Sequence, residues 1–253
     1  MTFHRKPFRA GILLLLPVCL WVMAAHASDK KNEAKTENKT IDSGSFGVFV
    51  KGTRVATETF HIQQGPTSST IKSELKQTAG ANPVTQKSDL QVTSAGELVR
   101  YDWNQSSGGS ITVLPNNEFL LEEINGPDFT KTAKQPFLMP NTSAILDNNF
   151  FIHREVLVWR YLAANCKTEN GNFNCQKAPA EFGVLIPQDR NSARIRLELV
   201  GDEKVSIRGS ERSLLRLNLK SDNFDWQLWV DTHDQFKLIR VAIPADETEV
   251  VRD

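Results

Sequence analysis

The densest group of side chains that could do chemistry is Asp231-Thr232-His233-Asp234. On a β-strand, Asp231 and His233 would project from the same face, because successive side chains alternate between the two faces. With a carboxylate from elsewhere, they could bind a divalent metal ion or act as a general base and its orienting acid. The same residues are also ordinary in a solvated turn between two strands, and we favour this second interpretation.

The sequence lacks the motifs of two other kinds of site, a serine-hydrolase nucleophile and a phosphate-binding loop. The sequence has no Gly-x-Ser-x-Gly segment, which would mark the nucleophile of a serine hydrolase. Gly44, Gly47 and Gly52 have the wrong spacing for a phosphate-binding loop, and a strand rather than a helix follows them. We therefore predict no catalytic residue, no metal site and no cofactor, and we expect the protein not to be an enzyme.

A binding role depends on one histidine and several aromatic residues. His153 lies near Asp147, where it is either a core histidine with a hydrogen-bond partner or a ligand contact. Trp226 lies on the apolar side of its strand, whereas Trp229 lies on the polar side, where an amphipathic ring suits the edge of a groove. The candidate ligand-binding residues are Trp103, Phe150, His153, Trp159 and Trp229, and core packing is the alternative for each tryptophan.

Cys166 and Cys175 flank a polar stretch that is typical of a turn. In an oxidising compartment, two cysteines this close in the chain most plausibly pair, and the closed loop adds about 3 kcal/mol of stability in the chain-entropy model. A redox-active pair is more often spaced Cys-x-x-Cys, and a zinc site would need two further ligands. We predict a structural disulfide, with redox activity and zinc binding as the alternatives.

The beginning of the chain predicts its destination. Arg5, Lys6 and Arg9 precede an apolar run from Gly11 to Met23. Ala25-His26-Ala27 then places small residues at the two positions that a signal peptidase reads. The apolar run is too short for the roughly 20 residues of a membrane-spanning helix. We predict a signal peptide over residues 1–27, cleaved after Ala27, and a periplasmic or secreted mature chain without a transmembrane segment.

Composition limits the rest of the chain. Residues 28–40 contain no large apolar side chain and cannot offset their ordering entropy by burial, so we expect a flexible linker over residues 28–42. Residues 43–253 are enough for one domain with a substantial core. The full chain balances 30 basic against 30 acidic residues, and removing the basic leader makes it slightly acidic. This charge argues against nucleic acid as a partner.

Alternation of apolar and polar residues predicts many short antiparallel strands. A hairpin over residues 46–62 comes first, and turn residues separate the strands that follow. Leu215, Leu217 and Leu219 alternate with polar residues, which gives their strand one dry and one wet face. The strands predicted after the hairpin lie near residues 69–77, 85–93, 98–104, 110–114, 118–124, 195–199, 215–219, 224–230 and 237–243.

One predicted helix interrupts this series of strands. Asn141, Thr142 and Ser143 are good N-cap candidates, and the apolar residues that follow lie mostly at helical spacings. We predict a helix over residues 143–164, although Val156 to Trp159 would also suit a buried strand. A sheet of roughly a dozen strands twists until it curls, splits or closes. The predicted fold class is therefore α+β and predominantly β, a large curved antiparallel half-barrel around one main helix, with a β-sandwich or closed barrel as the alternative.

Four segments carry a resemblance to known proteins. They are Gly47 to Gly52, Ile145 to His153, Trp226 to Asp231 and Leu238 to Val241. In the order of its elements the chain resembles uncharacterised exported bacterial proteins with a domain of unknown function, and more distantly the periplasmic half-barrels that carry lipoproteins or lipids. The resemblance implies a periplasmic protein whose concave apolar face shelters an acyl chain. It implies no catalytic residue.

These expectations combine into two functional hypotheses. The first is a non-enzymatic periplasmic binding or carrier protein for a hydrophobic, lipid-like ligand. The alternative is a structural or assembly factor of the cell envelope that acts through protein–protein contacts. The expected partner is accordingly a hydrophobic small molecule or lipid in the first case, and an envelope protein in the second.

Overall fold

The computed structural model describes residues 38–78, 83–126, 132–169, 172–176 and 178–253. The chain divides into two units, Met1–Lys35 and Thr36–Asp253, and all described residues belong to the second. The predicted signal peptide and most of the predicted linker therefore lie outside the described residues. The described part contains no helix that is long and apolar enough to cross a membrane.

Fifteen strands form a single sheet. In its first half lie β1 (Lys39–Val50), β2 (Thr53–Gln64), β3 (Ser68–Gln77), β4 (Thr85–Thr93), β5 (Leu98–Gln105), β6 (Ser110–Asn116), β7 (Phe119–Asn125) and β8 (Ala133–Phe137). In its second half lie β9 (Ala144–Ile145), β12 (Ala180–Ile186), β13 (Asn191–Ile207), β14 (Ser210–Lys220), β15 (Asp225–Asp231), β16 (Lys237–Ile243) and β17 (Thr248–Arg252). Two short 3-10 helices, η1 (Pro187–Asp189) and η2 (Pro244–Asp246), connect strands of the second half.

The strand order follows the sequence closely. It runs β8-β7-β6-β5-β4-β3-β2-β1-β17-β16-β15-β14-β13-β12-β9, so β1 and β17 join the first and last parts of the chain. All neighbours are antiparallel except β9 and β12, which are parallel. The predicted hairpin and the other predicted strands are confirmed. The meander forms because short turns connect strands whose apolar residues recur with a period of two.

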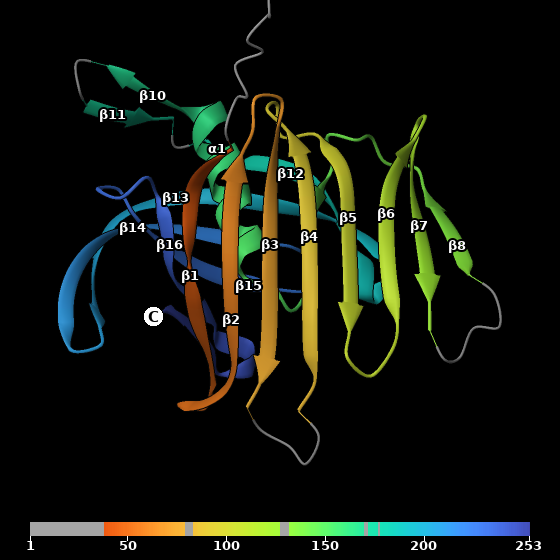
Figure 1. The fold of residues 1–253 in the computed structure, drawn as a ribbon. Coiled ribbons are helices and arrows are strands. Elements are labelled where there is room, and N and C mark those ends of the chain that lie inside the picture. The colour runs from red at the N-terminus through yellow and green to blue at the C-terminus, as the bar shows by residue number, and fades with distance from the viewer. Residues whose placement is uncertain (1–37, 79–82, 127–131, 170–171, 177) are drawn as a thin grey trace, which may run out of the picture. The chain divides into compact units, whose positions relative to one another are not determined.

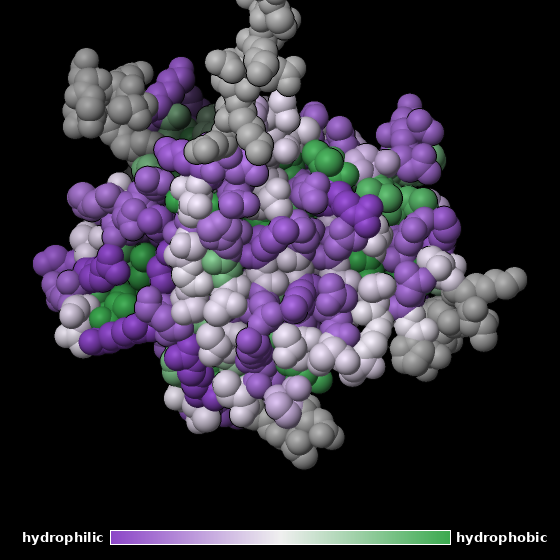
Figure 2. Space-filling model, viewed as in Figure 1, coloured by the Kyte–Doolittle hydropathy of each residue, from purple (hydrophilic) through white to green (hydrophobic). Residues whose placement is uncertain are grey.

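Side-chain alternation gives the sheet one inner and one outer face. Phe60 and Ile62 on β2 are buried, whereas their neighbour His61 is only partly covered. In register with them, Ile62 faces Ile71 on β3, and Ile71 faces Leu90 on β4. In the view of Figure 2, the outer surface over β2, β3 and β4 is mainly hydrophilic. The apolar side chains therefore gather on the concave side, as expected for a sheet with one buried face.

The helix α1 (Ile152–Asn165) lies on this concave side. In Figure 1 it lies between the part of the sheet formed by β1 to β4 and the part formed by β12 to β16. Its buried residues include Leu157, Val158 and Tyr161, which belong to the core cluster formed by both halves of the sheet. The predicted fold class, a large curved antiparallel sheet around one main helix, is confirmed.

The predicted start of the helix is wrong. We expected it at residue 143, but Ala144 and Ile145 form β9, and α1 begins only at Ile152. The cap does not come from Ser143 or its neighbours. The Glu58 carboxylate on β2 accepts the backbone N–H groups of Phe151 at 2.7 Å and of Ile152 at 3.2 Å. Pairing with β12 and capping by a distant strand thus override the local helix signals.

Other differences concern short or irregular strands. The sequence pattern missed β8, β9, β12 and β17 and the two short strands at Cys166–Glu169 and Asn172–Cys175, and it placed the end of the linker at residue 42 although β1 begins at Lys39. Asp42 is buried at this point and forms an ion pair with Arg252 on β17. The polar residues at the start of β1 therefore join the sheet with the help of Arg252, which lies more than two hundred residues later in the chain.

The predicted disulfide is confirmed. Cys166 and Cys175 are bonded and face each other across a separate two-stranded sheet formed by β10 (Cys166–Glu169) and β11 (Asn172–Cys175). This hairpin directly follows α1 and is not part of the large sheet.

An apolar groove and a buried polar network at opposite ends of the helix

A groove of about 560 Å³ lies beside the C-terminal half of α1. We call it the apolar groove. Strands β1 to β4 and the turn after β4 contribute Ile41, Ile62, Gln64, Ser69, Ile71, Val92, Thr93, Ser94, Ala95 and Gly96. The helix and β12 contribute Val156, Trp159, Arg160, Ala163, Ala164 and Phe182. Ligand pockets typically have volumes of roughly 300–1,000 Å³, so the groove is large enough for a small ligand.

The walls of the groove follow from strand and helix geometry. Ile62 and Ile71 are cross-strand neighbours on the concave face of the sheet. On α1, Val156, Trp159 and Ala163 are three and four residues apart, so they share one face of the helix. Small alanines occupy the last turn, which leaves space between the helix and the sheet where larger side chains would close it.

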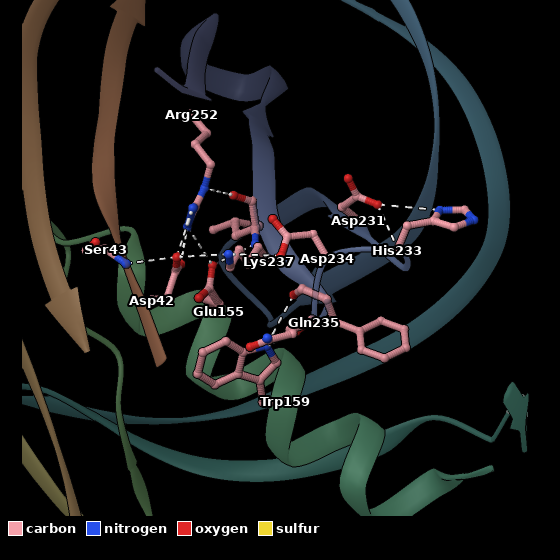
Figure 3. Close-up of polar contacts among 12 residues, drawn as sticks. Asp42, Ser43, Glu155, Trp159, Asp231, His233, Asp234, Gln235, Lys237 and Arg252 are labelled. Atoms are coloured by element: carbon pink, nitrogen blue, oxygen red, sulfur yellow. Dashed lines mark hydrogen bonds and ion pairs between the residues drawn. The ribbon is translucent and has the colours of Figure 1, made fainter. Parts of the chain in front are cut away.

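Trp159 is fixed in the wall by the turn between β15 and β16. Its indole N–H is shared between the carbonyl oxygens of Gln235 at 3.1 Å and Phe236 at 3.2 Å. Figure 3 shows this contact beside Asp234 and Lys237. Gln235 and Phe236 both have positive φ angles, 53° and 56°, which non-glycine residues rarely adopt. The indole bonds thus hold a strained turn and orient a large ring along the groove.

Arg160 is the charged residue of the groove. Its Nη2 donates to the Thr142 carbonyl oxygen at 2.8 Å, and its guanidinium lies 5.5 Å from the centre of the Phe182 ring. Its stem lies against Gly96, where an added Cβ would be 3.5 Å from the Arg160 side chain. Burial lowers the pKa of Arg160 from its ordinary value. Within the described residues, no carboxylate forms an ion pair with it.

At the other end of α1, the interior is filled by a buried polar network. Arg154 is fully buried, and its Nη1 donates to the carbonyl oxygens of Asp147 at 2.7 Å and Phe150 at 2.6 Å. Its guanidinium lies between two rings, 4.7 Å from the centre of Phe151 and 4.6 Å from that of Trp226. Burial lowers the pKa of Arg154 to about 10. The guanidinium therefore stays charged at neutral pH inside the protein.

Two buried carboxyl groups accompany Arg154. Glu58 accepts hydrogen bonds from the helix N-terminus and from the Ser73 hydroxyl at 2.7 Å, yet burial raises its pKa to about 7. Asp147 accepts hydrogen bonds from the Tyr101 hydroxyl and from Gln188. Burial raises the pKa of Asp147 as well. These contacts connect β2, β5 and η1 to the segment before the helix.

A second charged group joins the first and last strands of the chain, which are neighbours in the sheet, to the helix. Arg252 on β17 pairs with Asp42 on β1 and lies 3.4 Å from Glu155 on α1. Glu155 also accepts the backbone N–H of Leu238 at 2.6 Å, and Lys237 lies 3.6 Å from Asp42. Figure 3 shows how these side chains converge between β1, β16 and the helix. Burial first, and the nearby Asp42 second, raise the pKa of Glu155.

His153 lies on a small cavity of about 20 Å³ next to the apolar groove. The side chain is 1% exposed, and neither ring nitrogen has a hydrogen-bond partner among the described residues. Burial, helped by the charge of Arg154, lowers the pKa of His153 to about 3. Its ring is therefore neutral in the folded protein at neutral pH. Arg160 and Val156 line both this cavity and the apolar groove.

The five candidate ligand-binding residues do not form one site. Trp159 lines the apolar groove, and His153 lines the small cavity beside it. Phe150 is fully buried, with its ring centre 6.1 Å from that of His153. Trp103 donates its indole N–H to Gln86 at 3.0 Å on another part of the inner face.

Trp229 lies on the opposite face of the sheet. It is 3% exposed in a small apolar cluster with Val205, Ile207, Leu214, Ile239 and Val251. Arg240 lies 4.7 Å from the centre of its ring. The sequence pattern placed it correctly on a different side from Trp226, but another part of the sheet covers it.

Sequence reasoning missed most of the groove. Ile62, Ile71 and Arg160 were not candidates, because nothing in the local sequence distinguishes them from ordinary sheet and helix residues. One usable signal existed. Val156, Trp159, Arg160 and Ala163 share a helical face that combines a large aromatic ring, a cation and a small residue.

Asp231 ends β15, and Thr232, His233 and Asp234 lie in the turn that follows, which is the interpretation we favoured. His233 is exposed, and its backbone N–H donates to the Asp231 carboxylate at 2.9 Å. The same carboxylate accepts a hydrogen bond from Arg212 at 2.6 Å. No group of three or more histidine, cysteine or acidic side chains placed to hold a metal ion occurs within the described ranges.

Comparisons with known proteins add one structural likeness. No protein-family model matches the chain, and a search of curated proteins finds no match. A crystal structure from Brucella abortus, described as a beta-barrel-like protein of domain of unknown function DUF1849, is similar with a TM-score of 0.49 and 5% sequence identity. The similarity covers 83% of this chain and 94% of that one.

Proposed function

We propose that this protein is a non-enzymatic binding or carrier protein that holds a hydrophobic, lipid-like ligand in the apolar groove. The observation that carries the proposal is the groove of about 560 Å³ between Ile62 and Ile71 of the sheet and Trp159 of the helix. Apolar walls with a few polar groups are typical of small-molecule sites. Burying an acyl chain there would contribute about 0.8 kcal/mol for each buried methylene group.

Two further features support the compartment that we propose. The proposal places the protein outside the cytoplasm, in the periplasm or secreted, because the first residues read as a cleavable signal peptide. The disulfide between Cys166 and Cys175 agrees with an oxidising compartment. A ligand that is poorly soluble in water needs a carrier in such a compartment, and the groove would shelter it from water.

A blocking substitution tests the proposal. Ala164 lies in the last turn of α1 and lines the groove, so Ala164→Trp would fill it. A fluorescent fatty-acid probe should bind the wild-type protein, and Ala164→Trp should weaken binding roughly tenfold or more, because several methylene groups lose their contacts. Native mass spectrometry of protein purified from its own envelope should detect a bound lipid.

The matched control is Ala245→Trp. Ala245 is exposed in η2, next to the turn between β1 and β2, and does not line the groove. This variant should bind the probe like the wild type, and both variants should unfold at similar urea concentrations. The proposal fails if neither native lipid nor probe binds, or if Ala164→Trp binds the probe as tightly as Ala245→Trp.

A second candidate function is an envelope assembly factor that acts through the edge of the sheet. It is favoured by β8, which pairs only with β7 among the described strands, and by Leu138, which follows β8 and is 78% exposed. An unpaired edge can accept a strand from another protein. A photo-crosslinking residue at Leu138 should then capture an envelope protein, and recovery of the monomer alone would remove this candidate.

A further inference from the structure

The apolar groove contains a cation without an acidic partner. Among the described residues, Arg160 forms no ion pair, and its one hydrogen bond goes to the Thr142 carbonyl oxygen at 2.8 Å. Glu181 lies in an adjoining surface pocket that Arg160 also lines, but it pairs with Arg194 at 3.5 Å. A charge that is partly removed from water is unfavourable unless it is paired.

Arg160 lies where three neighbouring cavities meet. Its side chain lines the apolar groove, the small cavity at His153 and an adjoining surface pocket of about 420 Å³ that also contains Phe182. Burial lowers its pKa with no acidic group opposing that effect. The guanidinium therefore lies where one end of a ligand in the groove would meet it.

A second polar group faces the same space. His153 lies on the small cavity beside Arg160, is almost fully buried, and has two ring nitrogens without partners in the described part of the chain. Buried polar atoms are usually hydrogen-bonded, so such a side chain requires an explanation. The cavity of about 20 Å³ is large enough for one water molecule, which could connect His153 to a group bound at Arg160.

We propose that Arg160 binds the anionic head group of an amphiphile whose single acyl chain lies in the apolar groove. The inference rests on the proposed function and specifies its ligand. A guanidinium donates two parallel hydrogen bonds to a carboxylate or a phosphate, and Nη2 is already held by Thr142 in one orientation. Ile62, Ile71, Val156 and Trp159 then contact the chain. The ligand class is a fatty acid or an acyl-chain phosphate.

The test compares ligands that differ only in their head group. Dodecanoate, dodecyl phosphate and dodecanol are titrated against the wild-type protein and against Arg160→Gln. The wild type should bind at least one of the two anions roughly tenfold or more tightly than the alcohol, which is the size expected for a charge-assisted hydrogen bond. Arg160→Gln should lose this preference while its affinity for dodecanol changes less than about twofold.

Two further variants keep the interpretation specific. Arg194→Gln removes the same charge from a neighbouring exposed position, where the arginine is paired with Glu181, and should keep the preference for the anion. Arg160→Lys should retain part of it, because a lysine supplies the charge without the paired donors. The tighter of the two anions identifies the head group, carboxylate or phosphate.

The outcomes separate the inference from the proposed function. If dodecanol and the anions bind the wild type equally, or if Arg160→Gln weakens all three ligands alike, the inference is overturned while the groove remains a binding site. An equal loss of preference in Arg194→Gln would also overturn it. If none of the three ligands binds the wild type, both the inference and the proposed function fail.

Discussion

Each end of α1 carries an arginine, but one arginine is buried and the other lies at an open groove. Arg154, in the first turn, is fully buried between two aromatic rings and donates to two carbonyl oxygens. Arg160, in the last part of the helix, lies at an open groove with one hydrogen bond and no ion pair among the described residues. One end of the sheet's concave face is thus filled by side chains, whereas the other is open.

We infer that the filled end of the helix stabilises the fold and that the open end serves binding. The filled end joins the helix to β2, β5 and η1 through Glu58, Asp147 and Tyr101, so it fixes where the helix lies. The open end adds few such contacts, because small alanines line the groove there. A helix anchored at one end can leave space at the other. We expect substitutions at the filled end to change folding, and those at the groove to change binding.

The largest effect is expected from removing the buried arginine. Arg154→Met leaves two carbonyl oxygens and the nearby Glu58 and Asp147 without their cation, and should lower the free energy of unfolding by about 3–5 kcal/mol. Arg160→Met removes the same group at the groove and should change it by less than about 1 kcal/mol. Urea unfolding of both variants measures the difference. Equal losses would contradict the division between the two ends.

The pH dependence of stability tests His153 at the boundary between the ends. Its pKa is about 3 in the folded protein against an ordinary value of 6.5, so below pH 6.5 the unfolded chain binds a proton that the folded chain does not. The folded wild type should therefore lose stability relative to His153→Leu as the pH falls, by about 1.4 kcal/mol per pH unit between pH 6 and 4. Leucine has a similar volume and does not titrate.

The wild type has to be compared with His153→Leu because Glu58 changes stability with pH in the opposite direction to His153. Its pKa is raised to about 7 from 4.5, so the folded state holds a proton that the unfolded state has lost, and stability falls as the pH rises through this range. The contribution of Glu58 is common to both proteins and cancels. A constant difference between the wild type and His153→Leu across the range would show that His153 is not buried as a neutral ring.

A smaller effect is expected at the wall of the groove. Trp159→Phe removes the indole N–H that binds the Gln235 and Phe236 carbonyl oxygens, while it keeps most of the ring. The free energy of unfolding should fall by about 1 kcal/mol. Thermal unfolding measures this value. Hydrogen exchange should show faster opening of residues 231–236, and unchanged exchange there would mean that the indole does not hold the turn.

The smallest effect on the sheet is expected from the disulfide. Cys166 and Cys175 close only the hairpin of β10 and β11, which is separate from the large sheet. Replacing both with serine should open the hairpin locally and lower global stability by less than the roughly 3 kcal/mol of the chain-entropy model. Probe binding should persist. A global loss of that full size would show that the hairpin is coupled to the sheet.

The sequence was sufficient for most strands of the sheet and insufficient for the groove. Period-two alternation, as in Leu215, Leu217 and Leu219, predicts strands because it depends only on neighbouring residues. The start of the helix depends on Glu58, 93 residues before Phe151, and no local pattern contains that information. Trp159 was a candidate because it is a large aromatic residue, and it lines the groove, but the isoleucines opposite it become wall residues only through strand pairing.

The most direct test of the account locates the bound chain. A fatty acid carrying bromine atoms on its acyl chain quenches a tryptophan that it contacts. It should quench the fluorescence of the wild-type protein, and Trp159→Phe should lose most of that quenching while it still binds the ligand, because Trp103, Trp226 and Trp229 do not line the groove. Equal quenching in Trp159→Phe would place the chain elsewhere and contradict the assignment of the groove.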